Sequence, residues 1–264
     1  MRVTGSSQTY DITQQSAAVS GATVRSSGGV VTIEGGDAAD KIAVKKSLDG
    51  VEVTINGKTY ELSPAEYAKG IVVRGGKGND DLRVGWDVPV PVTIEGGDGH
   101  DKLTNSKDGA IVRGGAGDDE IQNHGRRAQI YGDGGKNKLQ NNAGHGSSIY
   151  GGDGDQIMNG ARDTFVRGGK SAHITSVGDG NTIELTGRRG HVTLVGDNNK
   201  VGGNGKDGFE VWSPRGNGNI YTGNDGYDRV EVKGDRNKIY GNGGGDHLEV
   251  KGTGNEVYRR RVKP

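Results

Sequence analysis

Aliphatic residues recur along this chain in two interleaved series that share one period. The first series stands before a glycine-rich segment and comprises Ile33, Val73, Ile94, Val112, Ile130, Ile149, Val166, Ile183, Val201, Ile220, Ile239 and Val257. The second series stands after that segment and comprises Ile42, Leu82, Leu103, Ile121, Leu139, Ile157, Ile174, Val192, Val211, Val230 and Leu248. Two series with a common period of about 18 residues predict two short strands and two tight corners per repeat.

A repeat of this length cannot bury its own apolar face, so neighbouring repeats must stack on one another. The chain is therefore expected to be all-β and to form a single right-handed parallel β-solenoid with two short strands per rung. We expect the solenoid to cover residues 31–258 and an N-terminal cap to cover residues 1–30. Residues 259–264 are expected to form a basic tail.

The period breaks at residues 45–70, where the step in the first series is 40 residues rather than about 18. Asn56-Gly57 stands there between two alternating runs, which is a strong short-range signal for a β-hairpin. Ser63 and Glu66 then match a capping box with a proline at the first helical position, which indicates a short helix. We expect this inserted hairpin and helix to lean on the side of the solenoid.

Composition and charge narrow the functional classes. The chain has 264 residues, of which 52 are glycine, and only 30% are hydrophobic, a composition that would indicate disorder if the period were absent. The formal net charge is zero, so no general attraction to nucleic acid or to an anionic membrane follows. No apolar run is long enough to cross a membrane as a helix. The absence of Cys excludes disulfides and thiol catalysis.

Residues 1–30 lack the apolar core of a cleavable secretory signal, which leaves a polar cap or an uncleaved export signal as the two interpretations of this segment.

Asparagines repeat with the same period and predict ladders of stacked amides. On the second strand of the middle rungs they are Asn105, Asn123, Asn141 and Asn159. Before the first strand of the later rungs they are Asn181, Asn199, Asn237 and Asn255, with a slip near residues 217–219. We expect both ladders to be structural.

Aspartates recur two residues before the aliphatic residue of the second strand. This corner column comprises Asp40, Asp80, Asp101, Asp119, Asn137, Asp155, Ala172, Gly190, Phe209, Asp228 and Asp246. Stacked strands lie about 4.8 Å apart, and two carboxylates at that distance repel by roughly 1 kcal/mol in water and by more where solvent is excluded. The column therefore favours a cation between its members. Carboxylate and carbonyl oxygens form the ligand set that Ca²⁺ prefers.

Three of these corners, at residues 75–82, 96–103 and 114–121, follow the pattern Gly-Gly-x-Gly-x-Asp-x-aliphatic. The pattern resembles the nonapeptide of the haemolysin-type, or repeats-in-toxin, proteins. The resemblance implies a parallel β-roll that binds Ca²⁺ between stacked corners, and it implies export by a bacterium. The metal-binding residues that it implies are Asp80, Asp101, Asp119, Gly75, Gly96 and Gly114, with a weaker pair of corners at Asp228 and Asp246.

The chain also departs from that family's pattern. Its second corners lack the motif, Asn137 interrupts the aspartate column, and Ala38 replaces a motif glycine. We therefore expect calcium on one edge only and at few sites. The alternative interpretation is that these corners are turns without a metal.

Outward-facing residues offer further candidates. Tyr221, Tyr240 and Trp212 are candidates for a ligand-binding face, because rows of exposed aromatic rings can stack on sugar rings. Flat aromatic rows that only stabilise the strands are the alternative.

Two pairs of outward residues bear on catalysis. Glu231 and Glu249 fall one rung apart, a separation that suits a retaining glycosidase, but lysines on the same face can neutralise them. His173 and His191 also fall one rung apart and suit a transition metal, but the sequence shows no third ligand. No catalytic residue is assigned on this basis.

These observations favour a binding protein over an enzyme. We expect an exported bacterial calcium-binding β-roll protein, secreted or delivered to a host cell, that acts in binding or host interaction. Its partner would be a host protein or a polysaccharide, and the chain would be a monomer or a weak end-to-end oligomer. The alternatives are a carbohydrate-active enzyme on a parallel β-helix (a polysaccharide lyase, hydrolase or epimerase) and a structural spacer.

Overall fold

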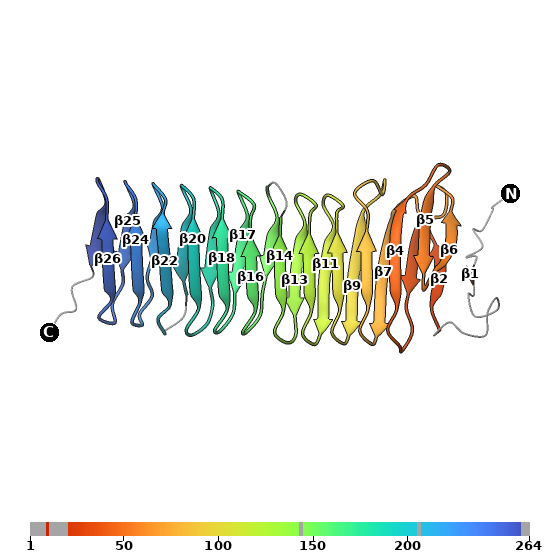
Figure 1. Ribbon diagram of the computed structural model, residues 1–264, viewed down its shortest axis with the longest axis horizontal. Coiled ribbons are helices and arrows are strands. Elements are labelled where there is room, and N and C mark those ends of the chain that lie inside the picture. The colour runs from red at the N-terminus through yellow and green to blue at the C-terminus, as the bar shows by residue number, and fades with distance from the viewer. Residues whose placement is uncertain (1–8, 11–20, 143–144, 205–206, 260–264) are drawn as a thin grey trace. The chain divides into compact units, whose positions relative to one another are not determined.

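A computed structural model describes residues 9–10, 21–142, 145–204 and 207–259. The chain divides into two compact units, Met1–Gln129 and Ile130–Pro264. Each unit is a stack of mostly parallel strands with two strands per rung (Figure 1). The prediction of an all-β parallel solenoid is therefore confirmed. The described residues contain no helix, and hence none that could span a membrane.

The first unit contains two sheets, which we call sheet A and sheet B in both units. Sheet A runs through β1 (Thr9–Tyr10), β2 (Thr23–Ser27), β3 (Val30–Glu34), β7 (Gly70–Lys77), β9 (Val92–Asp98) and β11 (Ile111–Ala116). Sheet B runs through β6 (Lys58–Leu62), β5 (Val51–Ile55), β4 (Lys41–Lys46), β8 (Asp81–Val84), β10 (Lys102–Asn105) and β12 (Glu120–Asn123).

The second unit continues the same pattern of alternate strands, with β13 (Gln129–Asp133) at the boundary. Its sheet A contains β15 (Ser148–Tyr150), β17 (Phe165–Gly168), β19 (Thr182–Leu185), β21 (Lys200–Gly203), β23 (Ile220–Thr222), β25 (Lys238–Gly241) and β27 (Glu256–Arg259). Its sheet B contains β14 (Lys138–Asn141), β16 (Gln156–Asn159), β18 (His173–Val177), β20 (His191–Val195), β22 (Glu210–Arg215), β24 (Arg229–Lys233) and β26 (His247–Lys251).

The two aliphatic series form the narrow core between the sheets. In the first unit Val112 pairs with Ile94, and Leu103 pairs with Ile121, and all four side chains are fully buried. Nearly all other members of both series are buried as well. The exceptions are Ile220, Leu248 and Val257. Leu248 and Val257 lie on β26 and β27, the terminal strands of their sheets, so no further described rung covers them.

Ile220 is an exception because the register differs from the predicted one. Val201 pairs with Tyr221, and Tyr221 pairs with Ile239, so Tyr221 takes the inward position. The asparagine ladder sets this register. The backbone N–H of Asn199 donates to Oδ1 of Asn219 at 2.7 Å. The slip predicted near residues 217–219 is a step of 20 residues from Asn199 to Asn219, and Asn219 continues the ladder across it.

Both asparagine ladders are buried except at Asn255, which is half-buried on the last described rung. In the first unit, Nδ2 of Asn105 donates to Oδ1 of Asn123 at 2.7 Å, and Nδ2 of Asn123 donates to the carbonyl of Gly125 at 2.7 Å. In the second unit, Nδ2 of Asn141 donates to Oδ1 of Asn159 at 2.9 Å. The amides of Asn105, Asn123 and Asn141 thus bond to a corner carbonyl or to the next amide, which a buried polar group requires.

The insertion forms the predicted hairpin, but it extends a sheet rather than leaning on the side of the solenoid. β5 pairs with β4, and β6 pairs with β5, both antiparallel. The turn between β5 and β6 has positive φ at Asn56 (48°) and Gly57 (83°), as a two-residue hairpin of this type requires. The insertion therefore forms the end of sheet B in the first unit.

The predicted short helix is wrong. Oε2 of Glu66 accepts hydrogen bonds from N and Oγ of Ser63, so the expected cap contact forms, but the segment continues as turns. Only residues 63–69 separate two strands, which is too short a stretch to repay the cost of nucleating a helix. The buried side chain of Tyr67 holds the turn in place.

The expected N-terminal cap is described only in part. β2 pairs antiparallel with β3 and so ends the parallel stack of sheet A in the first unit. Residues 1–8 and 11–20 of the predicted cap, and residues 260–264 of the predicted basic tail, lie outside the described residues.

Candidate calcium corners and outer-face sites

The corner aspartates of the first unit form a ladder of charge-assisted hydrogen bonds. The backbone N–H of Asp40 donates to Oδ1 of Asp80 at 2.7 Å, and the N–H of Asp80 donates to Oδ1 of Asp101 at 2.8 Å. The N–H of Asp101 donates to Oδ1 of Asp119 at 2.8 Å. Each carboxylate therefore holds the preceding rung with one of its oxygens. This structural role was not predicted from the sequence.

In two of these carboxylates the second oxygen, Oδ2, does not accept a comparable hydrogen bond. Oδ2 of Asp80 and Oδ2 of Asp101 are buried and have no hydrogen-bond partner among the residues that the structure describes. The neighbouring corner differs, because Oδ2 of Asp40 accepts the N–H of Gly36 at 2.7 Å. A buried acceptor without a donor is costly, so a proton or a cation beside Oδ2 would stabilise these corners.

Burial also shifts the ionisation of this column. Desolvation, aided by the neighbouring carboxylates, raises the pKa of Asp80 to about 6 and that of Asp119 to about 6. Desolvation also raises the pKa of Asp101. In the second unit desolvation raises the pKa of Asp228 to about 6. The metal-free column therefore carries ionised carboxylates at neutral pH at an energetic cost.

The motif glycines allow the corner to close tightly around the carboxylates. A Cβ added to Gly75 would lie 2.2 Å from Oδ2 of Asp80 and 2.4 Å from the carbonyl oxygen of Gly96. A Cβ added to Gly96 would lie 2.3 Å from both Oδ2 of Asp101 and the carbonyl oxygen of Gly114. Carboxylate and carbonyl oxygens therefore converge over each glycine.

The motif glycines lie within the strands, so their carbonyls are not all free to face a cation. β7, β9 and β11 continue through them, and Gly76 pairs with Gly97, which pairs with Gly115. Their backbone groups are therefore partly committed to the sheet, because a parallel ladder continues wherever the register is kept.

The fit to a divalent cation consequently differs from corner to corner. The donor set at Asp80 and Asp101 suits Ca²⁺, because it combines buried carboxylate oxygens that lack donors with adjacent glycine carbonyls. At Asp228 both oxygens are already used: Oδ1 accepts the N–H of Phe209 at 3.0 Å and Oδ2 accepts that of Asn224 at 2.8 Å. Oδ1 of Asp246 accepts the N–H of Asp228 at 3.1 Å. The weaker pair of predicted corners therefore has less need of a metal.

The three predicted ligand-face aromatics do not form one face. Tyr221 points inward, is 1% exposed, and burial raises its pKa to about 12, so its assignment to an outer ligand face is wrong. Tyr240 lies on sheet A, where its ring stacks on that of Tyr258 with centroids 4.8 Å apart. Trp212 is exposed but lies on sheet B, paired with Thr193 and Glu231.

The predicted carboxylate pair on sheet B is present and has a third neighbour. Glu231 pairs in register with Glu249, and one potential ligand atom of each lies within 4.8 Å of one on His247. Ion pairs already engage both carboxylates, with Arg229 at Glu231 and with Lys251 at Glu249. His247 was not predicted from the sequence, although it stands 18 residues after Arg229 and therefore pairs with Arg229 on the next rung.

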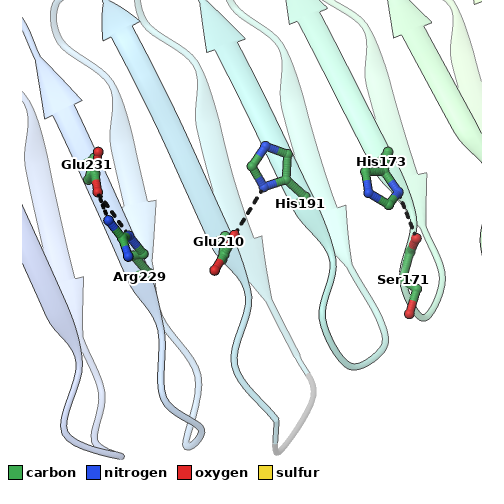
Figure 2. Close-up of polar contacts among 6 residues, drawn as sticks. All are labelled: Ser171, His173, His191, Glu210, Arg229 and Glu231. Carbon is green, nitrogen blue, oxygen red and sulfur yellow. Dashed lines mark hydrogen bonds and ion pairs between the residues drawn. The ribbon is translucent and has the colours of Figure 1, made fainter.

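The two predicted histidines also lie in register on sheet B. His173 pairs with His191, and their ring centroids are 6.1 Å apart. Nδ1 of His173 contacts the carbonyl of Ser171 at 3.1 Å, and Nδ1 of His191 contacts Oε2 of Glu210 at 3.4 Å (Figure 2). Glu210 is the residue that the sequence did not connect with the histidines, and it occupies the next position of their column.

Comparison with protein-family models, curated proteins and solved structures found no match.

Proposed function

We propose that this protein is an exported bacterial β-roll protein that binds Ca²⁺ at the corners of its first unit and acts in binding rather than catalysis. The observation that supports this proposal most directly is the pair of buried oxygens, Oδ2 of Asp80 and Oδ2 of Asp101, to which no described residue donates a hydrogen bond. The similarity of these corners to the repeats-in-toxin nonapeptide adds support.

Calcium bound there would neutralise carboxylates that burial makes costly to ionise. Asp80, Asp101 and Asp119 would supply carboxylate oxygens, and Gly96 and Gly114 would supply carbonyl oxygens. The ladder of backbone bonds to Oδ1 fixes the spacing of the carboxylates before the metal arrives. Such preorganisation lowers the cost of binding.

A binding role fits the outer surfaces better than catalysis does. The outer faces are flat sheets, and the corners between them are short. Cations already engage the two paired glutamates on sheet B, with Arg229 at Glu231 and Lys251 at Glu249, so neither carboxylate is held free for a substrate. A carbohydrate-active enzyme on the same scaffold is the second candidate.

The first experiment is thermal unfolding in chelator, in millimolar Ca²⁺ and in millimolar Mg²⁺. A ligand that binds only the folded state at about 100 times its Kd stabilises it by about 2.7 kcal/mol. We expect calcium to raise the Tm and magnesium to do so poorly, because Mg²⁺ requires a tight octahedron and retains its waters.

The matched variants are Asp101→Asn and Asp228→Asn. Asn keeps an Oδ1 acceptor for the backbone ladder but removes the charge, so Asp101→Asn should fold and lose most of the calcium response. Asp228→Asn should keep the response, because its carboxylate is already satisfied by backbone donors. Superimposable melting curves of the native protein in chelator and in calcium would refute the proposal.

A further inference from the structure

The corner column of the second unit loses its carboxylates at three successive rungs. Ala172, Gly190 and Phe209 stand where Asp would continue the column, and each is buried. Cationic residues lie beside this gap: Lys170, Arg188 and Arg189 in the turns that lead into β18 and β20, and Arg229 at the start of β24. The same edge that is acidic in the first unit is therefore mainly basic here.

Two adjoining depressions of about 540 and 560 Å³ lie at this edge. They share Arg189, Gly208 and Tyr227, so we treat them together and call them the corner groove. Only glycine fits at position 208 of the groove, because a Cβ there would lie 1.5 Å from the carbonyl oxygen of Tyr227. Its lining residues come from neighbouring rungs, so the groove runs from rung to rung. Figure 2 shows four of them, His173, His191, Glu210 and Arg229, on successive strands of sheet B.

The charge of the corner groove is positive. The described residues that line it include four permanent cations, Lys170, Arg188, Arg189 and Arg229, against two carboxylates, Asp207 and Glu210. His173 and His191 add charge when they are protonated. The protein as a whole has no net charge, so this is a local concentration of cations.

The cations differ in how far they are already engaged. Nε of Arg188 lies 2.6 Å from Oδ2 of Asp207, and Arg229 pairs with Glu231. The side chains of Lys170 and Arg189 make no ion pair with any of the described residues. Exposed pairs contribute little stability, so an incoming anion can compete for Arg188 as well.

An exposed aromatic ring lies among these cations. Tyr227 is 59% exposed and lines both parts of the corner groove. An exposed ring offers an apolar face and a hydroxyl together, which suits the face and the hydroxyl groups of a sugar. Glu210 and Asp207 offer acceptors for sugar hydroxyls.

We propose that the corner groove of the second unit binds an acidic polysaccharide, with Lys170 and Arg189 contacting its anionic groups and Tyr227 stacking on a sugar ring. Successive rungs lie about 4.8 Å apart, so cations on neighbouring rungs suit a linear polymer that repeats its charge. Single-stranded nucleic acid fits less well, because its sites stack successive bases on several aromatic rings. This inference specifies the ligand within the proposed binding role, but it does not depend on calcium.

The test is binding to short oligosaccharides, which calcium cannot crosslink into gels, measured by calorimetry at about 0.15 M salt. The probes are an oligouronate, a heparin oligosaccharide, a neutral dextran oligosaccharide and single-stranded DNA. We expect the oligouronate or the heparin fragment to bind, so that the tighter of the two identifies carboxylate or sulfate as the preferred group. Dextran should not bind.

The variant Lys170→Ala/Arg189→Gly removes both unengaged cations. Glycine suits position 189 because Arg189 has a positive φ of 54°. We expect its affinity for the acidic probe to fall by about tenfold or more. The control Lys200→Ala/Arg236→Gly removes the same charge outside the groove, again at a positive-φ arginine (56°), and should bind normally. Tyr227→Ser should also weaken binding.

Three results would overturn the inference: no binding to either acidic probe, an equal loss of affinity in the control, or tighter binding to DNA than to both. Cleavage of the oligosaccharide would instead support the groove and contradict the non-enzymatic role. Each binding measurement is made in calcium and in chelator. Failure of the calcium proposal would leave glycan binding intact, and failure of glycan binding would leave the calcium-dependent Tm intact.

Discussion

At the scale of single residues, the main feature is that one carboxylate carries two separate roles. Oδ1 of Asp101 receives the backbone N–H of Asp80, which holds adjacent rungs together, and its Oδ2 is buried without a donor. The first role is independent of metal, and the second favours one. An aspartate column in a solenoid is therefore not by itself proof of calcium, and the two oxygens must be tested separately.

The ionisation of the column predicts how metal-free stability depends on pH. The folded-state pKa of Asp80 and of Asp119 is about 6, because burial disfavours the charged form, whereas the unfolded value is about 4. The folded state then binds more protons than the unfolded state between these values. Stability from these groups is fully present below about pH 4 and is lost as the pH rises through about 6. We therefore expect the Tm of metal-stripped protein to rise as the pH is lowered from 7 to 5.

The comparison for this prediction is the double variant Asp80→Asn/Asp119→Asn, in which the pH dependence should weaken. Saturating calcium should also weaken it, since the metal favours the ionised carboxylates. The opposite result, a Tm of the metal-stripped native protein that decreases as the pH is lowered from 7 to 5, would argue that these carboxylates are ionised in a well-solvated site.

The buried amides give a second prediction at this scale. Asn123 is fully buried and donates to the carbonyl of Gly125, while its Oδ1 accepts from Asn105. Asn123→Ala leaves those partners unsatisfied and should lower the free energy of unfolding by roughly 1–3 kcal/mol. Denaturant unfolding measures this change, and an unaltered midpoint would show that water replaces the amide.

At the scale of strands and corners, close backbone approach explains the glycine motif better than freed carbonyls do. Gly75 stands at the end of β7, where any side chain would meet both Asp80 and the next rung. The repeat pattern predicted the strand positions, the hairpin at Asn56 and the buried amides. The pattern failed at Tyr221, because the inward position is set by the ladder residue Asn219 and not by the aliphatic residue Ile220.

These failures have physical causes. In the C-terminal half, a ladder amide stands two residues before each inward residue, so counting from Asn219 would have placed Tyr221 in the core. The helix predicted after Ser63 failed because a local capping signal cannot show how soon the next strand begins. The corner groove was missed because no contiguous motif marks it: its residues meet only through the stacking of four rungs.

A glycine substitution tests the close approach directly. Gly75→Ala would place a Cβ 2.2 Å from Oδ2 of Asp80, so the corner must shift. We expect a loss of roughly 1–3 kcal/mol in the free energy of unfolding, as for other overpacked sites, together with weaker calcium binding. Gly160→Ala is the control, since its nearest contact would be the carbonyl of Asn141 at 3.7 Å. Equal effects of the two substitutions would contradict the argument.

At the scale of the whole molecule, the two units differ in the residues that one repeat places at the corners. The first unit keeps the acidic, glycine-rich corners and is capped by antiparallel strands, β2 on sheet A and β5 and β6 on sheet B. The second unit replaces the acidic corners at three rungs and gathers cations there. We infer a division between a metal-stabilised part and a ligand-binding part within one repetitive fold.

The measurement that tests the central claim most directly is a calcium titration of metal-stripped protein by isothermal titration calorimetry, with bound metal determined independently by elemental analysis. The account predicts saturable binding of calcium to the native protein, with ions in the gaps between the corners of Asp80, Asp101 and Asp119. Binding should be largely lost in Asp101→Asn and retained in Asp228→Asn. Absence of binding heat and of protein-bound calcium in the native protein would show that the corners are hydrogen-bonded turns and nothing more.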